Sequence, residues 1–204
     1  MSKGSVFIIS GPSGSGKDAL LAELFEKCPE IKFSISSVTR GMREGEKEGV
    51  KYNFISREKF ESMIENDELL EYNLYVDNYY GTPKKPIEDA VQNNQDIFIE
   101  VDVNGAQIIR EKLPEAISIF VLPPSFEELK RRLSARGTET EEIITLRMAA
   151  ALDEIKRAGE YDYIVVNDDL LTAVDNIIAI IKGSKFCLKK QKYIINEVLK
   201  NVKS

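Results

Sequence analysis

The chain has 204 residues, the size of one ordinary domain or of one domain with insertions. Its 43% hydrophobic and 30% charged residues exclude a disordered or fibrous chain and predict a globular one with a substantial core. The net charge of −6 argues against a nucleic-acid-binding protein with a basic surface, although it is compatible with a small basic pocket for a phosphorylated ligand.

Residue types exclude further classes of protein. The chain has no histidine, so a histidine-based catalytic triad and a histidine-ligated zinc site are impossible. Cys28 and Cys187 lie far apart without metal-binding spacing, and we interpret them as reduced thiols. Because the N-terminal apolar run is too short for a signal peptide and no stretch has membrane-spanning length, we expect a cytoplasmic protein with no membrane partner.

Strand-like and helix-like segments alternate along the chain. The apolar run at 6–9 predicts a buried strand, which a Gly/Ser-rich turn and a helical stripe follow. Further buried strands are predicted at 97–101, 117–122 and 163–166, and helices at about 104–112, 125–134, 141–157 and 170–182. This alternation predicts an α/β fold with a doubly wound, mostly parallel sheet.

Three segments depart from this alternation. Residues 34–83 are polar, with short alternating pieces, and predict an inserted, partly β subdomain that carries a binding site. The charged connector 135–142 is interpreted as either a solvated loop or a mobile lid. The lysine-rich tail 185–203 has apolar residues at helical spacing and predicts a packing helix with a solvated basic face rather than a membrane-binding one.

The Gly/Ser-rich turn matches the first seven positions of the phosphate-loop motif G-x-x-x-x-G-K-[ST]. In such a loop, backbone N–H groups converge on phosphate oxygens, and the following helix adds a favourable dipole. The preceding strand and following helix favour this interpretation over a structural glycine turn. The predicted phosphate-binding residues are Gly11, Pro12, Ser13, Gly14, Ser15, Gly16 and Lys17.

Asp18 departs from the motif, because the usual hydroxyl residue at this position ligates Mg²⁺. Three interpretations are open for Asp18. It is an acid favoured by the helix dipole, a carboxylate ligand of Mg²⁺, or a charge that repels nucleotide phosphate.

A second candidate site follows in the inserted segment. Arg40 and Arg43 could clamp a phosphate monoester, and a solvated basic turn is an equally good interpretation of these two residues alone. Tyr52, Glu71 and the block 78–82 downstream suggest a nucleotide pocket, although tyrosine and glutamate are also ordinary surface residues.

Seven blocks in one order, between Gly4 and about Lys182, resemble guanylate kinases of the nucleoside monophosphate kinase group. They are residues 11–17, 36–46, 78–82, 102–106, 120–125, 136–140 and 165–169. The resemblance implies transfer of the ATP γ-phosphate to GMP, and also to dGMP, with Mg²⁺ bound alongside ATP. It implies a P-loop kinase core at about 1–33, 84–134 and 148–204, an α+β GMP-binding subdomain at 34–83, and a helical lid at 135–147.

The resemblance also implies roles for individual residues. Arg40 and Arg43, with the hydroxyls of Tyr52 and Tyr80, would hold the GMP phosphate. Ser36, Glu71 and Thr82 would recognise the guanine base. Asp102 would be the acidic residue of the GMP site. A carboxylate at Glu71 accepts from both the ring N–H and the amine of guanine, a donor pair that adenine lacks.

On the ATP side, the resemblance implies three lid arginines that stabilise the transferring phosphoryl group, and an asparagine beside adenine. These are Arg132, Arg136, Arg147 and Asn167; with Lys17, Arg40 and Arg43, the arginines form the implied catalytic set. Arg131 and Arg157 are interpreted as helix-surface salt bridges. No general base is required, because the acceptor is already a phosphate oxyanion.

The sequence is also compared with three rival functions that it could serve. A catalytically dead guanylate-kinase-like binding module is supported only by Asp18 and Ala19, because the phosphate loop and the lid arginines are intact. A kinase for another phosphorylated small molecule is disfavoured by Glu71 and Ser36. A GTPase-type switch is disfavoured because the Asn-Lys-x-Asp motif is absent. Both a monomer and a homo-oligomer are compatible with the sequence.

Overall fold

The computed structural model describes residues 4–135 and 140–200. The strands are β1 (Val6–Ser10), β2 (Lys32–Phe33), β3 (Ser36–Val38), β4 (Tyr52–Phe54), β5 (Leu69–Tyr75), β6 (Asn78–Pro83), β7 (Ile97–Glu100), β8 (Ile117–Leu122) and β9 (Tyr163–Val166). The helices are α1 (Lys17–Lys27), α2 (Arg57–Glu65), α3 (Lys84–Gln92), α4 (Val103–Lys112), α5 (Phe126–Ser134), α6 (Glu141–Lys156), α7 (Leu170–Ser184) and α8 (Leu188–Leu199), and a short 3-10 helix spans Ala158–Glu160. Within these two ranges, no helix is long and apolar enough to cross a membrane.

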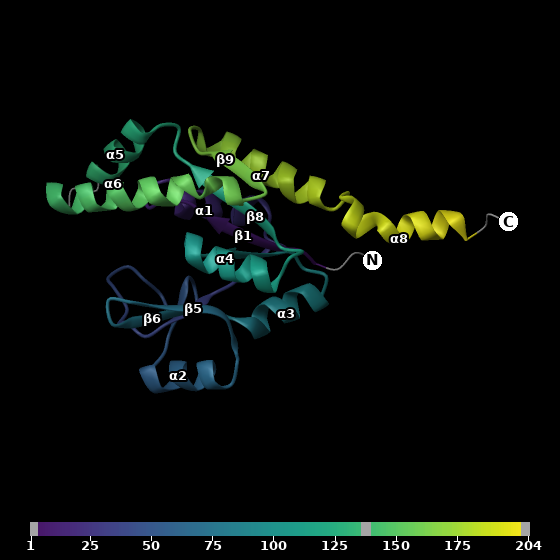
Figure 1. The fold of residues 1–204 in the computed structure, drawn as a ribbon, viewed down its shortest axis with the longest axis horizontal. Helices are drawn as coiled ribbons and strands as arrows, with labels where there is room; N and C mark the ends of the chain where they lie inside the picture. Colours follow the sequence, from purple (N-terminus) through teal and green to yellow (C-terminus); the bar gives the residue numbers. More distant parts are fainter. Residues whose placement is uncertain (1–3, 136–139, 201–204) are drawn as a thin grey trace.

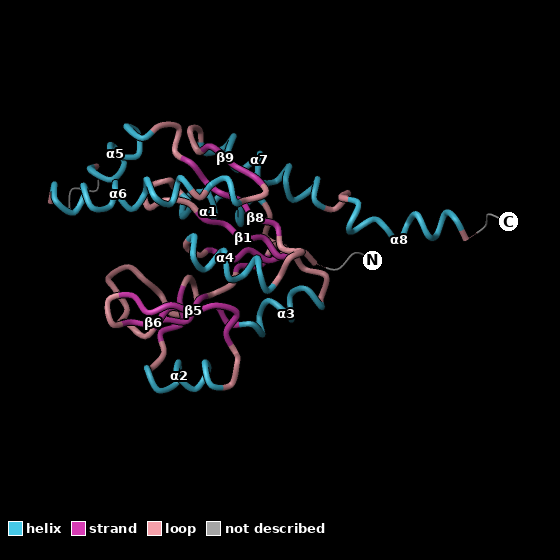
Figure 2. The backbone as a smooth tube through the Cα atoms, in the orientation of Figure 1, coloured by secondary structure: helices cyan, strands magenta, loops and turns pink. Residues whose placement is uncertain are grey.

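The core sheet has five parallel strands in the order β2-β7-β1-β8-β9. Its central strand β1 is buried on both faces, because successive side chains point to opposite sides. Phe7 and Ile9 pack with α1 and α7, whereas Ile8 packs with α3 and α4. Helices therefore cover both faces, which confirms the predicted doubly wound α/β fold (Figures 1 and 2).

A second sheet, in the order β4-β3-β6-β5, is formed entirely within residues 36–83. Only the pair β3 and β4 is parallel. Helix α2 packs against this sheet through Phe60, whose ring stacks on Tyr79 with the centroids 5.0 Å apart. The sheet and α2 lie at one end of the molecule, on the opposite side of α4 from α1 and α6 (Figure 1).

Helices α5 and α6 form an arm beside the core sheet. Leu129 and Leu133 of α5 pack against Met148 and Ala151 of α6. The connector between the two helices was predicted to be a loop or lid; its residues 136–139 lie outside the described residues. Helix α6 begins at Glu141, so the second half of the predicted lid segment is helical.

The tail forms the predicted helix, α8, but its predicted packing on the core is wrong. Ile194, Ile195 and Val198 are 43%, 47% and 67% exposed, and α8 extends away from the core beyond α7 (Figure 1). The reason is that a 3.6-residue apolar period predicts a helix without identifying its partner. Both faces of the core sheet are already covered by other helices.

Candidate active site

The phosphate loop runs from the end of β1 to the start of α1. Gly14 and Gly16 have φ angles of 90° and 89°, in the left-handed region that favours glycine. A Cβ atom on Gly16 would lie 2.3 Å from Nδ2 of Asn167, so a larger residue there would displace this amide. The loop therefore places the N-terminus of α1, with its unpaired N–H groups and positive dipole end, at the edge of the core sheet.

Lys17, the first residue of α1, folds back over this loop. Its Nζ donates to the carbonyl oxygens of Gly11, at 2.5 Å, and Pro12, at 3.2 Å. Burial lowers the pKa of Lys17, and the nearby carboxylates of Glu100 and Glu154 oppose that shift. The buried ammonium is thus held at the position where an anionic ligand of the loop would bind.

Three of the predicted ATP-side residues surround the loop. Asn167 donates to the carbonyl of Ser15 at 2.9 Å, and Arg132 donates to the carbonyl of Asn167 at 3.0 Å. Arg147 of α6 donates to the Ser13 hydroxyl. The structure therefore brings Arg132, Arg147 and Asn167 to the phosphate loop, whereas Arg136 lies outside the described residues.

A cavity of about 310 Å³, which we call the acceptor cavity, lies between the second sheet and the core. It is lined by five of the predicted acceptor-site residues, Ser36, Tyr52, Glu71, Tyr80 and Asp102. These residues are separated by up to 66 positions in sequence and come from four strands and a helix N-cap. The predicted pocket is therefore a single cavity.

Glu71 is a buried carboxylate at this cavity, with only 6% of the residue exposed. It pairs across β5 and β6 with Thr82, whose Oγ1 donates to Glu71 Oε1 at 2.5 Å. Burial raises the pKa of Glu71, and the Thr82 hydrogen bond opposes that shift. The other oxygen, Oε2, would lie 3.1 Å from a Cβ on Gly105, so glycine there leaves space for the carboxylate.

Arg40 and Arg43, the predicted phosphate clamp, differ in their surroundings. Arg40 forms a two-point salt bridge with Glu46, at 2.7 and 2.6 Å, and lies over the Tyr52 ring at 5.0 Å from its centroid. The Arg40 guanidinium and the Arg43 backbone N–H lower the pKa of Glu46 to about 2. The Arg43 side chain is exposed, and neither arginine lines the acceptor cavity.

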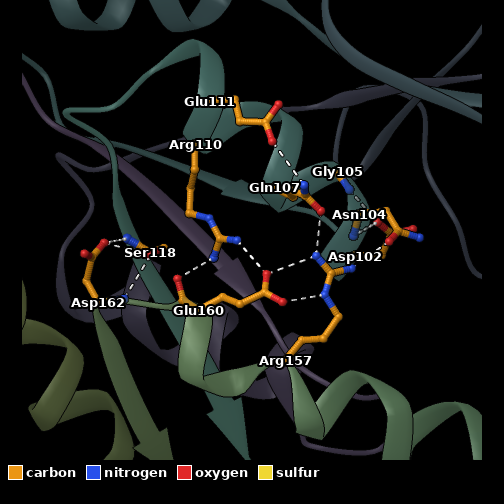
Figure 3. A network of polar contacts seen from close by, with 10 residues as sticks. All are labelled: Asp102, Asn104, Gly105, Gln107, Arg110, Glu111, Ser118, Arg157, Glu160 and Asp162. Carbon is orange, nitrogen blue, oxygen red and sulfur yellow. Dashed lines mark hydrogen bonds and ion pairs between the residues drawn. The ribbon is translucent and has the colours of Figure 1, made fainter.

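Asp102 is fixed by its position as the N-cap of α4. Its Oδ1 accepts from the backbone N–H groups of Asn104, at 3.0 Å, and Gly105, at 2.8 Å. Arg157 at the end of α6 donates to Asn104 Oδ1 at 2.7 Å and is also paired with Glu160 (Figure 3). This network joins the α6 arm to the helix that presents Asp102.

A second cavity of about 450 Å³, the phosphate-loop cavity, adjoins the first. Its lining from the phosphate loop and the start of α1 consists of Gly11, Ser13, Gly14, Gly16, Lys17 and Asp18. Ser36, Tyr52, Glu100 and Asp102 line both cavities. Two anionic ligands, one in each cavity, would therefore meet end to end, an arrangement suited to moving a phosphoryl group from one to the other.

A comparison with protein families agrees with this geometry. The family model described as guanylate kinase matches residues 3–184. The chain belongs to the guanylate kinase family.

Individual relatives extend the match to nearly the whole chain. The guanylate kinase of Clostridioides difficile (strain 630) is 47% identical over 198 residues, covering 97% of each chain. That of Desulfitobacterium hafniense (strain Y51) is 43% identical over 195 residues, covering 96% of this chain and 98% of the relative. The crystal structure of guanylate kinase from Anaplasma phagocytophilum matches with a TM-score of 0.80 at 31% identity, covering 98% of this chain and 96% of that one.

In this guanylate kinase, several residues at the two cavities were not predicted from the sequence, among them Asn73, Lys51 and Glu154. Asn73 lines the acceptor cavity and donates to Asp102 Oδ2 at 3.2 Å; it lies two residues after Glu71 on β5, a spacing that predicts the same face. Lys51 and Glu154 line the phosphate-loop cavity. Neither belongs to a local motif, since the fold brings them to the loop from distant positions.

Proposed function

We propose that this guanylate kinase, which transfers the ATP γ-phosphate to GMP, binds GMP in the acceptor cavity and ATP at the phosphate loop. The observation that carries this assignment is the buried carboxylate of Glu71, in a cavity that adjoins the phosphate-loop cavity. A phosphate loop alone would suit many nucleotide-dependent enzymes, whereas Glu71 supplies a reason to select guanine.

Guanine selection follows from hydrogen-bond chemistry. An ionised Glu71 accepts from the ring N–H and the exocyclic amine of guanine, while Thr82 keeps the carboxylate in place. Adenine would satisfy none of the acceptor capacity that Thr82 leaves open on this buried carboxylate, at a cost of roughly 1–3 kcal/mol or more. Ser36 on the neighbouring strand is placed to add a hydroxyl contact. The proposal extends to dGMP, because these contacts do not use the ribose 2′-hydroxyl.

The GMP phosphate is proposed to bind Arg40, Arg43, Tyr52 and Tyr80. Arg40 is not a lining residue of the cavity itself, but it lies over the ring of Tyr52, which is, and this contact supports a phosphate position beside both. Its two-point salt bridge to Glu46 shows how a planar fork engages two oxygens, and a phosphate offers the same geometry. GMP would share Arg40 with Glu46 or displace that carboxylate.

For the transfer step, an oxygen of the GMP phosphate attacks the γ-phosphorus of ATP. The bond from that phosphorus to the β–γ bridging oxygen breaks, and ADP leaves with the electron pair. We propose that Lys17 and the lid arginines Arg132, Arg136 and Arg147 stabilise the charge on the phosphoryl group. No side chain needs to remove a proton from the acceptor, so positioning and water exclusion carry the reaction.

Mg²⁺ is proposed to bind together with ATP, where it would neutralise charge on the phosphate oxygens. Asp18 and Glu100 fit this proposal, because both are hard oxygen donors and both contact the same ammonium group, that of Lys51. Within residues 4–135 and 140–200, no group of three or more acidic, cysteine or histidine residues could hold a metal alone. That suits Mg²⁺, which keeps water and substrate phosphates among its ligands.

The two substrates are nucleotides of the cytoplasm, and we propose that compartment as the place of action. A test of the binding assignment is calorimetric titration with GMP, IMP and AMP. IMP keeps the ring N–H of guanine but lacks the amine, so affinity should fall in the order GMP, IMP, AMP. Equal affinity for GMP and AMP would contradict guanine selection by Glu71.

A further inference from the structure

Lys51 lines the phosphate-loop cavity, beside Tyr52 and Glu100, which line both cavities. It precedes β4 of the second sheet, and its Nζ donates to Asp18 Oδ1, on the first turn of α1. The same Nζ lies 3.0 Å from Glu100 Oε2, at the end of β7. One ammonium group therefore connects the phosphate-loop helix, the core sheet and the second sheet.

The surroundings of Lys51 are rich in negative charge. Asp18, Glu100 and Glu154 all line the phosphate-loop cavity, and Lys17 is occupied by carbonyl groups of the loop itself. Carboxylates beside a phosphate chain repel it, most strongly where protein replaces water. In addition to Lys17 and the arginines at the loop, a cation in direct contact with these carboxylates would reduce the repulsion at its source.

Lys51 is placed to offset this repulsion, because its ammonium group contacts both Asp18 and Glu100. The side chain of Glu100 is only 14% exposed, so its interaction with Lys51 is partly shielded from solvent. Asp18 is 74% exposed and contributes a weaker, solvent-screened interaction.

The departure of Asp18 from the phosphate-loop motif explains why a cation is needed beside it. The usual residue has a neutral hydroxyl, so the motif itself requires no compensating cation. Here an anionic side chain takes that position, and Lys51 reaches it from 33 residues away in sequence. The extra negative charge and the cation that neutralises it thus occur together.

We propose that Lys51 is a positioning residue for ATP, which neutralises Asp18 and Glu100 so that the phosphate chain can bind beside them. This inference rests on the proposed binding of ATP at the phosphate loop. Lys51 acts through the two carboxylates. Its importance for ATP binding should therefore depend on whether residue 18 carries a charge, and it should be greatest when Mg²⁺ is absent.

The test is a double-mutant cycle of Lys51→Met and Asp18→Thr, with ATP affinity measured by calorimetry in EDTA. Lys51→Met should weaken ATP binding by about tenfold when residue 18 is aspartate, but by only about threefold when it is threonine. Lys51→Arg should retain most of the wild-type affinity, since it keeps the charge. Lys47→Met is the matched control, because Lys47 is an exposed lysine outside both cavities, and it should change nothing.

An equal loss in the aspartate and threonine backgrounds would overturn the proposal, since it would show that Lys51 does not act through Asp18. Wild-type affinity of Lys51→Met for ATP would also overturn it. Either result leaves the proposed function intact if the wild-type chain binds ATP and phosphorylates GMP. Thermal unfolding of each variant separates misfolding from weakened binding, and a folded Lys51→Met variant with the expected loss supports the proposal.

Discussion

Thr82 Oγ1 donates a 2.5 Å hydrogen bond to Glu71 Oε1, and both residues are buried beside the acceptor cavity. The bond holds one carboxylate oxygen and fixes the side chain across the β5–β6 pair. A buried carboxylate is costly unless it is paired, so its presence here points to a ligand that supplies the missing donors.

The first prediction concerns substrate use by Glu71→Gln. Glutamine loses one acceptor for the guanine donors, and the lost charged hydrogen bond is worth about 2 kcal/mol, or roughly thirtyfold in kcat/KM for GMP. The KM for ATP should hardly change. Steady-state kinetics with each substrate varied in turn measure both values. The exposed Glu65→Gln serves as a control, and GMP use at wild-type efficiency by Glu71→Gln would show that the assignment is wrong.

The second prediction concerns the stability of the same variant without ligand. Burial raises the folded-state pKa of Glu71, so the folded chain binds the proton more tightly than the unfolded chain does. This residue therefore favours folding at low pH, and that contribution is lost as the pH rises through the raised pKa. Glu71→Gln should consequently unfold at higher urea concentration than wild type at pH 8, and the difference should shrink towards pH 4. A destabilised variant at pH 8 would contradict this account.

The third prediction concerns the network that joins α6 to α4. Arg157, and to a lesser extent Arg110, lower the pKa of Glu160 to about 2, below its ordinary 4.5. Its stabilising contribution is therefore full above about pH 5 and is lost as the pH falls towards 2. Glu160→Gln should lower the free energy of unfolding at pH 7 by less than about 1 kcal/mol, because Glu160 is 41% exposed and solvent screens the pair.

That difference should decrease steadily between pH 5 and pH 3 in urea unfolding experiments. Glu111→Gln, on α4, is a suitable control variant for the loss of a carboxylate. In the part of the network drawn in Figure 3, Glu111 accepts only from the uncharged Gln107. A Glu160→Gln effect that is independent of pH would argue against an ionic contribution.

The fourth prediction is closure of the molecule around its substrates. The arginines proposed to contact phosphate lie on separate elements: Arg40 follows β3, Arg132 is on α5 and Arg147 is on α6. They must converge to exclude water from the transferring group. Small-angle scattering should show a smaller radius of gyration with GMP and an inert ATP analogue together than with neither. Superposable crystal structures of the two states would rule closure out.

Much of the fold was predictable, because apolar runs and helical stripes identify the main strands and helices. All four predicted strands of the core sheet are present, from β1 to β9. The two-residue strand β2 was missed, as it is too short to show a period. Helix α2 was hidden in the polar segment 34–83, and the short helix α3, directly after that segment, was also missed. The exposure of α8 was not predictable, because an amphipathic sequence indicates a helix but does not identify the surface against which it packs.

The residues of the candidate site were likewise only partly predictable from the sequence. Lys17 and Tyr80 were identified from their motif blocks and Glu71 from the family resemblance, and the structure brings them to adjoining cavities. Lys51 and Glu154 could not be found in this manner, because their importance arises from charges that only the folded chain brings together. The ion pair of Asp18 with Lys51 likewise could not be inferred from the loop sequence.

The most direct test of the central claim is a coupled assay of ADP formation with ATP, Mg²⁺ and each of GMP, AMP, CMP and UMP. The account predicts rapid turnover with GMP, and at least about a hundredfold lower kcat/KM with the other three, as expected when a buried hydrogen-bonding group is left unpaired. Comparable turnover with AMP, or no turnover with any acceptor, would contradict it.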